Sequence, residues 1–296
     1  MKDYCAEYEQ YLASQKKVSA NTLQSYRRDI HQYLDFLISK SLTPLTATSE
    51  AAAKFLSNLE EIGRSQASIT RMIASIRSYY QFLMILGVTD RNIMQGIHAK
   101  KAEKKLPETL TGKEVNLLLM QPDVTELKGC RDKAMLELLY ATGIRVSELI
   151  DLNVTDVNIQ VGIVYLHSDK AERIVPLYPN AVKAVADYLS RCRSIILAGQ
   201  EQDALFTNMN GQRLTRQGFW KIIKTYTKQA NIQKDISPHT LRHSFATHLL
   251  ENGAQLKDVQ EMLGHADISS TQVYSQLLKK KYQDVYNKYH PKARKA

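Results

Sequence analysis

Histidine and arginine residues gather in one short stretch, 238–248, which reads Pro-His-Thr-Leu-Arg-His-Ser-Phe-Ala-Thr-His. Pro238 is typical of the first position of a helix, so His239 and Arg242, three residues apart, share one face near the helix N-terminus. That end of a helix attracts anions, because its first N–H groups have no helical partner and its dipole is positive there. The spacing therefore predicts a compact site for a phosphate group.

The histidines of this stretch also suggest an alternative, a metal site made of His239, His243 and His248. Their spacing matches no standard zinc motif, and no cysteine, glutamate or aspartate is placed to complete a ligand set. We therefore predict no metal and no other cofactor. If this stretch stood alone, ordinary polar helix residues would explain it.

Two other segments carry related chemistry. Arg145 comes just after a glycine suited to end a helix, Gly143, and Glu148 follows three residues later on the next helix. This pair is either a simple ion pair or a guanidinium held rigid by a carboxylate, ready for a phosphate. Farther along, His265 stands just past another helix stop, and Tyr274 follows nine residues later.

The elements that position these residues form two predicted domains. Apolar residues recur at helical spacing over 23–37, 51–62 and 69–86. Four to five short helices of this kind predict a small all-helical domain over 1–99. The charged, proline-ended stretch 100–108 has little to bury and predicts a linker, which leaves 109–296 as the second domain.

The second domain is predicted to be helical with one small β-hairpin. Its helix signals are a capping box at Thr111 and Glu114 and an N-cap at Ser237. The predicted helices cover 132–140, 182–197, 219–230, 238–253 and 256–263. Two β-rich runs, 162–166 and 173–177, flank a turn at 168–171 and predict the hairpin. The fold class is therefore mainly α with a small β-sheet in the second domain.

Composition bounds the class of protein. The chain has 296 residues, a net charge of +10 and a pI near 9.3. No window is apolar enough to cross a membrane and the start carries no secretory signal, so we expect a soluble cytoplasmic protein. The charge is uneven, with +5 over 1–106, −1 over 107–276 and +6 over 277–296. If the middle segment binds a polyanion, it must therefore do so through local clusters of basic residues.

Taken together, these segments resemble the tyrosine recombinase (phage integrase) family, most closely its bacterial Xer-type members. The run 141–149, Ala-Thr-Gly-Ile-Arg-Val-Ser-Glu-Leu, is similar to the family's first arginine box, and 239–249 to its second. The third box is similar to 263–265, Leu-Gly-His, followed by Tyr274. In the first domain, 19–29 is similar to the helical, SAM-like core-binding domain of the family. The resemblance also implies that the segment after Tyr274 is a C-terminal tail exchanged with a neighbouring protomer.

The resemblance implies an α+β catalytic domain that cuts and rejoins DNA through a 3′-phosphotyrosyl bond, without metal or ATP. The implied catalytic residues are Arg145, Lys170, His239, Arg242, His265 and the nucleophile Tyr274, with Glu148 supporting Arg145. Two arginines suit this chemistry, because each guanidinium offers paired donors to the charge that develops on the phosphate oxygens. The family places its lysine in a glycine-rich hairpin turn, whereas this turn lacks the glycines and is one residue shorter. Lys170 is the lysine available there.

DNA contacts are expected from basic residues of both domains. The candidates are Arg27, Arg28, Arg71, Arg77, Arg213, Arg216, Lys221 and Lys224. The last four surround the predicted helix 219–230, which resembles the groove-facing helix of the family. We expect mostly phosphate contacts there. The alternative is a solvated face on a basic protein.

The function expected from the resemblance is site-specific recombination that resolves chromosome or plasmid dimers at a dif-like site, a role in chromosome partition. Double-stranded DNA is the expected partner, bound by a tetramer on two sites, either homomeric or with a paralogous recombinase. Control by a DNA translocase stays open, and the expected location is the cytoplasmic nucleoid. The alternatives are an integrase of a mobile element, a type IB topoisomerase and an inactive DNA-binding homologue.

Overall fold

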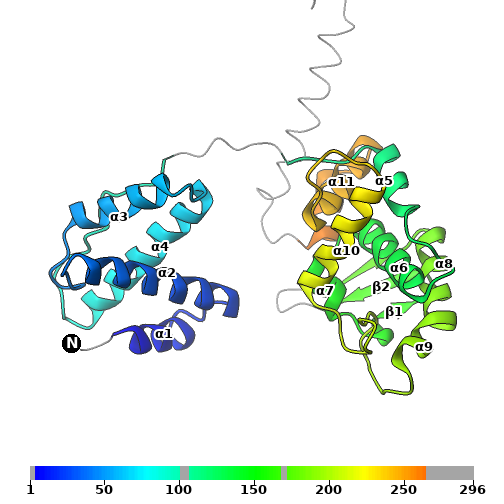
Figure 1. Cartoon of the computed structure of the whole chain (residues 1–296), viewed down its shortest axis with the longest axis horizontal. Helices are drawn as coiled ribbons and strands as arrows, with labels where there is room; N and C mark the ends of the chain where they lie inside the picture. The colour runs from blue at the N-terminus through cyan, green and yellow to red at the C-terminus, as the bar shows by residue number, and fades with distance from the viewer. Residues whose placement is uncertain (1–3, 101–106, 168–171, 265–296) are drawn as a thin grey trace, which may run out of the picture. The chain divides into compact units, whose positions relative to one another are not determined.

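A computed structural model describes residues 4–100, 107–167 and 172–264. The chain divides into two compact units, Met1–Lys104 and Lys105–Ala296 (Figure 1). Within the described residues, no helix is long and apolar enough to cross a membrane.

The N-terminal unit is helical over its described residues. Its helices are α1 (Cys5–Ser14), α2 (Ala20–Ser39), α3 (Ser49–Glu61) and α4 (Gln66–Ile85). Ser19 caps α2, because its hydroxyl accepts a hydrogen bond from the Thr22 N–H at 3.2 Å. Thr48 and Ser65 cap α3 and α4 in the same way, so both helices begin a few residues before the predicted starts.

The C-terminal unit combines helices with one small sheet, which confirms the predicted fold class. Its helices are α5 (Gly112–Leu119), α6 (Leu127–Thr142), α7 (Val146–Asp151), α8 (Pro179–Asp187), α9 (Arg193–Leu197), α10 (Arg216–Gln229), α11 (Pro238–Glu251) and α12 (Leu256–Leu263). A short 3₁₀ turn, Val154–Asp156, precedes the sheet. The predicted helix over 182–197 is interrupted by a π turn, Tyr188–Cys192, for which the sequence carries no proline or glycine signal.

The sheet consists of β1 (Val157–Asn158), β2 (Ile163–Leu166) and β3 (Arg173–Pro176). The three strands lie in the order β1-β2-β3 and are antiparallel, which confirms the predicted hairpin. β1 was not predicted, because two residues are too few to show an alternating pattern. Leu166 pairs with Arg173 at the end of the hairpin nearest its turn.

α6 lies inside the C-terminal unit, where it packs against α5, α7, α8 and α11 (Figure 1). It ends at Gly143, as predicted, in the left-handed conformation with φ of 58°. A Cβ atom on Gly143 would lie 2.3 Å from Cδ1 of Phe245, on α11. The glycine therefore serves two purposes, a left-handed helix end and a close approach of two helices.

Replacing Gly143 with alanine is expected to lower the free energy of unfolding by about 3 kcal/mol, because a left-handed backbone and an overpacked contact with Phe245 both cost energy. Gly199→Ala is the matched control. Gly199 also has positive φ, but nothing lies within 4 Å of its Cβ position, so about 1 kcal/mol is expected. Urea unfolding followed by the fluorescence of Trp220, the chain's one tryptophan, measures both. Equal losses would contradict the packing argument.

Candidate active site

Arg242 is a buried arginine that joins the ends of two helices. It lies on α11, which begins at Pro238 after the predicted N-cap, Ser237. Its side chain is only 4% exposed. Nη1 donates to the Gly143 carbonyl at 2.5 Å, and Nη2 donates to the Leu263 carbonyl at 2.7 Å. The guanidinium thus ties α11 to the C-terminal ends of α6 and α12.

Arg145 occupies the N-cap position of α7 and contacts Glu148, as the sequence predicts. The backbone N–H of Arg145 donates to Oε2 of Glu148 at 2.7 Å, and Nη1 lies 3.3 Å from Oε1. Nη2 donates to the Gly264 carbonyl at 3.4 Å. The Arg145 side chain is 42% exposed, so its guanidinium is held by the protein and is also open to solvent.

A third arginine, Arg173, belongs to the same network, and the sequence analysis did not assign it to the site. It lies at the start of β3 and donates from Nη1 and Nη2 to the two carboxylate oxygens of Glu148, at 2.9 Å and 3.0 Å. Its Nε donates to the Met262 carbonyl at 2.8 Å. The signal that could have found it is its place in the sequence, three residues after Lys170.

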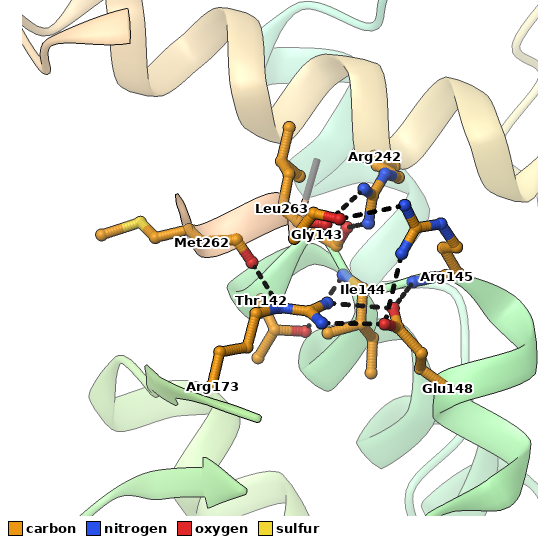
Figure 2. A network of polar contacts seen from close by, with 10 residues as sticks. Thr142, Gly143, Ile144, Arg145, Glu148, Arg173, Arg242, Met262 and Leu263 are labelled. Atoms are coloured by element: carbon orange, nitrogen blue, oxygen red, sulfur yellow. Dashed lines mark hydrogen bonds and ion pairs between the residues drawn. The ribbon is translucent and has the colours of Figure 1, made fainter. Parts of the chain in front are cut away.

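The three arginines converge on the C-terminal end of α12 (Figure 2). Met262, Leu263 and Gly264 are consecutive, and each carbonyl accepts a hydrogen bond from a different arginine. The last carbonyls of a helix lack partners within it and carry the negative end of the helix dipole, so cations stabilise them. α12 ends in a left-handed glycine, Gly264, with φ of 63°, which confirms the predicted stop.

Glu148 is ionised at neutral pH. Burial raises the pKa of its carboxyl, but hydrogen bonds from Arg173 and from the Arg145 backbone, with the charges of both arginines, outweigh burial and leave the pKa below its ordinary value. The carboxylate therefore supplies a fixed negative charge between two guanidiniums. Such charge-assisted, bidentate pairs hold an arginine in one orientation.

The histidines of α11 differ in their surroundings. His239 is exposed near the helix start, where it can reach a ligand. Burial, together with the nearby His239 and Arg242, lowers the pKa of His243 to about 4, so its ring is neutral at pH 7. Nδ1 of His248 lies 2.9 Å from the Tyr140 hydroxyl. Within the described residues, no cluster of histidine, cysteine or carboxylate side chains could hold a metal ion.

Three predicted catalytic residues, Lys170, His265 and Tyr274, lie outside the described residues, as does the basic tail over 277–296. The structure does describe their neighbours in the sequence. β2 and β3 flank the segment that contains Lys170, and Gly264 immediately precedes His265.

The predicted DNA-contact residues fall into two groups. Some are engaged within the protein: Arg27 pairs with Glu9, Arg71 with the buried Asp29, and Arg77 with the Ile97 carbonyl. Arg213 donates to the carbonyls of Ile150 and Leu152 and to Oδ1 of Asn153, a structural role that the sequence did not predict. Arg28, Arg216 and Lys221 are exposed.

An exposed tryptophan adds to the basic face of α10. Trp220 is 48% exposed, and Nζ of Lys224 lies 4.9 Å from the centre of its ring. Lys224 also pairs with Asp235. An aromatic ring flanked by cations is a surface that suits a nucleic acid, since the ring offers a flat apolar contact and the cations meet phosphates.

Comparison with known protein families identifies the family. Residues 108–281 match the model of the phage integrase family, and residues 5–86 match the model of the phage integrase N-terminal SAM-like domain. The chain belongs to the phage integrase family. It is therefore a tyrosine recombinase, a DNA strand-exchange enzyme, as the sequence predicts.

Individual relatives agree with this assignment. The chain is 48% identical to the tyrosine recombinase XerD of Oceanobacillus iheyensis, an alignment that covers 99% of this chain and 100% of that protein. Its fold is similar to that of the XerH recombinase bound to palindromic difH substrate, with a TM-score of 0.77, 20% identity, and coverage of 96% and 84% of the two chains. A lambda integrase tetramer bound to a Holliday junction is similar with a TM-score of 0.71, 20% identity, and coverage of 92% and 76%.

Replacing Glu148 with glutamine is expected to lower the free energy of unfolding at pH 7 by about 3 kcal/mol, because Arg173 is left buried without its counter-charge. The carboxyl pKa is lowered in the folded protein, so this stabilisation is present at neutral pH and is lost as the pH falls through that pKa. The difference in free energy of unfolding between wild type and variant should therefore disappear at acidic pH. Trp220 fluorescence during urea unfolding at several pH values measures it.

Glu172→Gln is the control for this measurement. Glu172 pairs with His167 on the surface and its side chain is 81% exposed, so its loss should change stability by less than about 0.5 kcal/mol. If the free energy of unfolding of Glu148→Gln differs from that of wild type by the same amount at pH 7 and at acidic pH, the carboxylate charge is not the stabilising feature.

Proposed function

We propose that this tyrosine recombinase resolves chromosome or plasmid dimers at a dif-like site. The observation that carries the chemistry is the convergence of Arg145 and Arg242, each held by the protein, beside the helix end that leads to His265 and Tyr274. The choice of site rests on the relatives named XerD and on the similarity to XerH bound to difH substrate.

In this proposal the phenolic oxygen of Tyr274 attacks a DNA phosphorus. A bond forms between that oxygen and phosphorus, the bond to the 5′ oxygen breaks, and the 3′ phosphate stays on the protein. Covalent capture conserves the phosphodiester energy, so rejoining needs no ATP. Arg145 and Arg242 offset the charge that develops on the non-bridging oxygens, and each such donor is typically worth about 3–4 kcal/mol.

Proton transfer falls to the remaining groups. An ordinary tyrosine has a pKa of about 10, so Tyr274 must lose its proton as it attacks. His239, exposed on the helix that carries Arg242, is the proposed acceptor, with His265 orienting the phosphate or the tyrosine. Lys170, on the hairpin between β2 and β3, is the proposed donor to the departing 5′ oxygen. General acid–base help of this kind is worth ~10²–10⁴-fold.

The proposal assigns the two domains separate roles. Residues 1–99 form a core-binding DNA domain, and 109–296, joined by the linker 100–108, carry the chemistry. The exposed face of α10, with Arg216, Lys221 and Trp220, contacts the DNA. The working assembly is a tetramer on two sites in the cytoplasm, homomeric or with a paralogue, under the control of a translocase where one is present.

A mobile-element integrase is the second candidate, and it would use the same catalytic residues. The match to XerD over 99% of this chain and 100% of that protein favours the first candidate. An inactive homologue is disfavoured, because Arg145 is held by Glu148 and Arg242 is held by the carbonyls of Gly143 and Leu263. Footprinting on genomic DNA with covalent trapping separates these candidates, since dimer resolution requires a single chromosomal site.

Replacing Tyr274 with phenylalanine is expected to abolish covalent adduct formation on a nicked suicide DNA substrate, because the attacking oxygen is absent. DNA binding in a gel-shift assay should stay within about twofold, since the basic contacts remain. Tyr282→Phe is the matched control and should form adduct at the wild-type rate. Adduct formed by the Tyr274 variant, or lost in the Tyr282 variant, would refute the nucleophile assignment.

A further inference from the structure

Arg173 is largely buried, and its guanidinium is paired within the protein. Its side chain is 10% exposed, whereas that of Arg145 is 42% exposed. All three of its guanidinium nitrogens donate within the protein, to Met262 and to both oxygens of Glu148. A buried guanidinium is stable only with such complete pairing.

The contacts of Arg173 join elements that carry different parts of the proposed chemistry. It begins β3, three residues after Lys170 in the sequence. Its carboxylate partner, Glu148, also binds Arg145. Its carbonyl partner, Met262, lies in the last turn of α12, two residues before Gly264, after which the chain continues to His265 and Tyr274.

The end of α12 packs directly against this guanidinium. A Cβ atom on Gly264 would lie 2.8 Å from Nη1 of Arg173, and Gly264 has φ of 63°. Arg173 therefore packs directly against the glycine that ends α12. A lysine at position 173 keeps the charge but cannot bond Glu148 and Met262 with a planar fork.

We propose that Arg173 is a positioning residue that fixes the end of α12 and thereby the approach of Tyr274 to the phosphate. The inference rests on the proposed function of Tyr274 as the nucleophile. Arg173 contacts neither the phosphate nor the leaving group in this account. A misplacement of a reacting group by about 1 Å costs on the order of 10²-fold in rate, which is the effect expected from its loss.

The test measures adduct formation in a single turnover by Arg173→Lys on three nicked suicide substrates. One has an ordinary scissile phosphate, one a neutral methylphosphonate, and one a 5′-bridging sulfur, which is a better leaving group. A positioning role predicts the same loss, on the order of 10²-fold, on all three substrates. DNA affinity should stay close to wild type, and urea unfolding measures how much stability the variant loses. Lys170→Ala is the comparison variant. Its loss of rate should be smaller on the sulfur substrate, because a sulfur leaving group needs less help from an acid.

Each other outcome overturns the proposal. If Arg173→Lys forms adduct at the wild-type rate on the methylphosphonate substrate, Arg173 is a phosphate ligand. If it does so on the 5′-bridging sulfur substrate, Arg173 supports Lys170, the proposed acid. A variant that loses adduct only in proportion to stability or DNA affinity makes Arg173 purely structural. If Arg173→Lys forms adduct at the wild-type rate on all three substrates, the positioning role is wrong, whereas the proposed function still stands. Wild-type protein that forms no adduct refutes the proposed function itself.

A second variant tests the same point without removing the buried charge. Gly264→Ala presses on Arg173 and strains the end of α12, so it should also slow adduct formation equally on all three substrates. Gly253→Ala is its control, since Gly253 also has positive φ, precedes α12, and has nothing within 4 Å of its Cβ position. Equal rates for the two glycine variants would contradict the proposal, even if Arg173→Lys fails to fold.

Discussion

The carboxylate of Glu148 is the group around which the candidate active site is built. Burial of an unpaired carboxylate costs several kcal/mol, and here Arg145, Arg173 and a backbone N–H satisfy both of its oxygens. The pairing fixes the start of α7 against β3. Through Arg173 it also fixes the end of α12. Without this charge, Arg145, the arginine proposed to meet DNA, would keep only its long hydrogen bond to the Gly264 carbonyl.

The site forms where helices begin and end. Gly143 ends α6, Arg145 precedes α7, and Gly264 ends α12. Carbonyls at helix ends lack helical partners, and Arg242 supplies donors to two of them, those of Gly143 and Leu263. The contacts that stabilise the fold are thus also the ones that orient the arginines. The protein therefore holds the arginines that we propose to bind the phosphate in place before DNA arrives, which is the condition for electrostatic catalysis.

Sequence reasoning predicted the features whose signals are local. The cap at Ser237 and the stop at Gly143 were correct, because each depends on residues within one helical turn. The roles of Arg173 and Arg213 were missed, because their partners lie between 25 and 89 residues away in the sequence. The π turn within 188–192 has no composition signal at all. The family resemblance supplied the proposed catalytic set, whereas the network that holds Arg145 and Arg242 is visible only in three dimensions.

The central claim is that Arg145 offsets negative charge on a DNA phosphate while the protein holds its guanidinium. The most direct test is single-turnover adduct formation by Arg145→Ala on a scissile phosphodiester and on a methylphosphonate, which lacks that charge. If Arg145 has this role, the variant loses rate on the order of 10²–10³-fold on the phosphodiester and much less on the methylphosphonate. Equal losses on both substrates would contradict it.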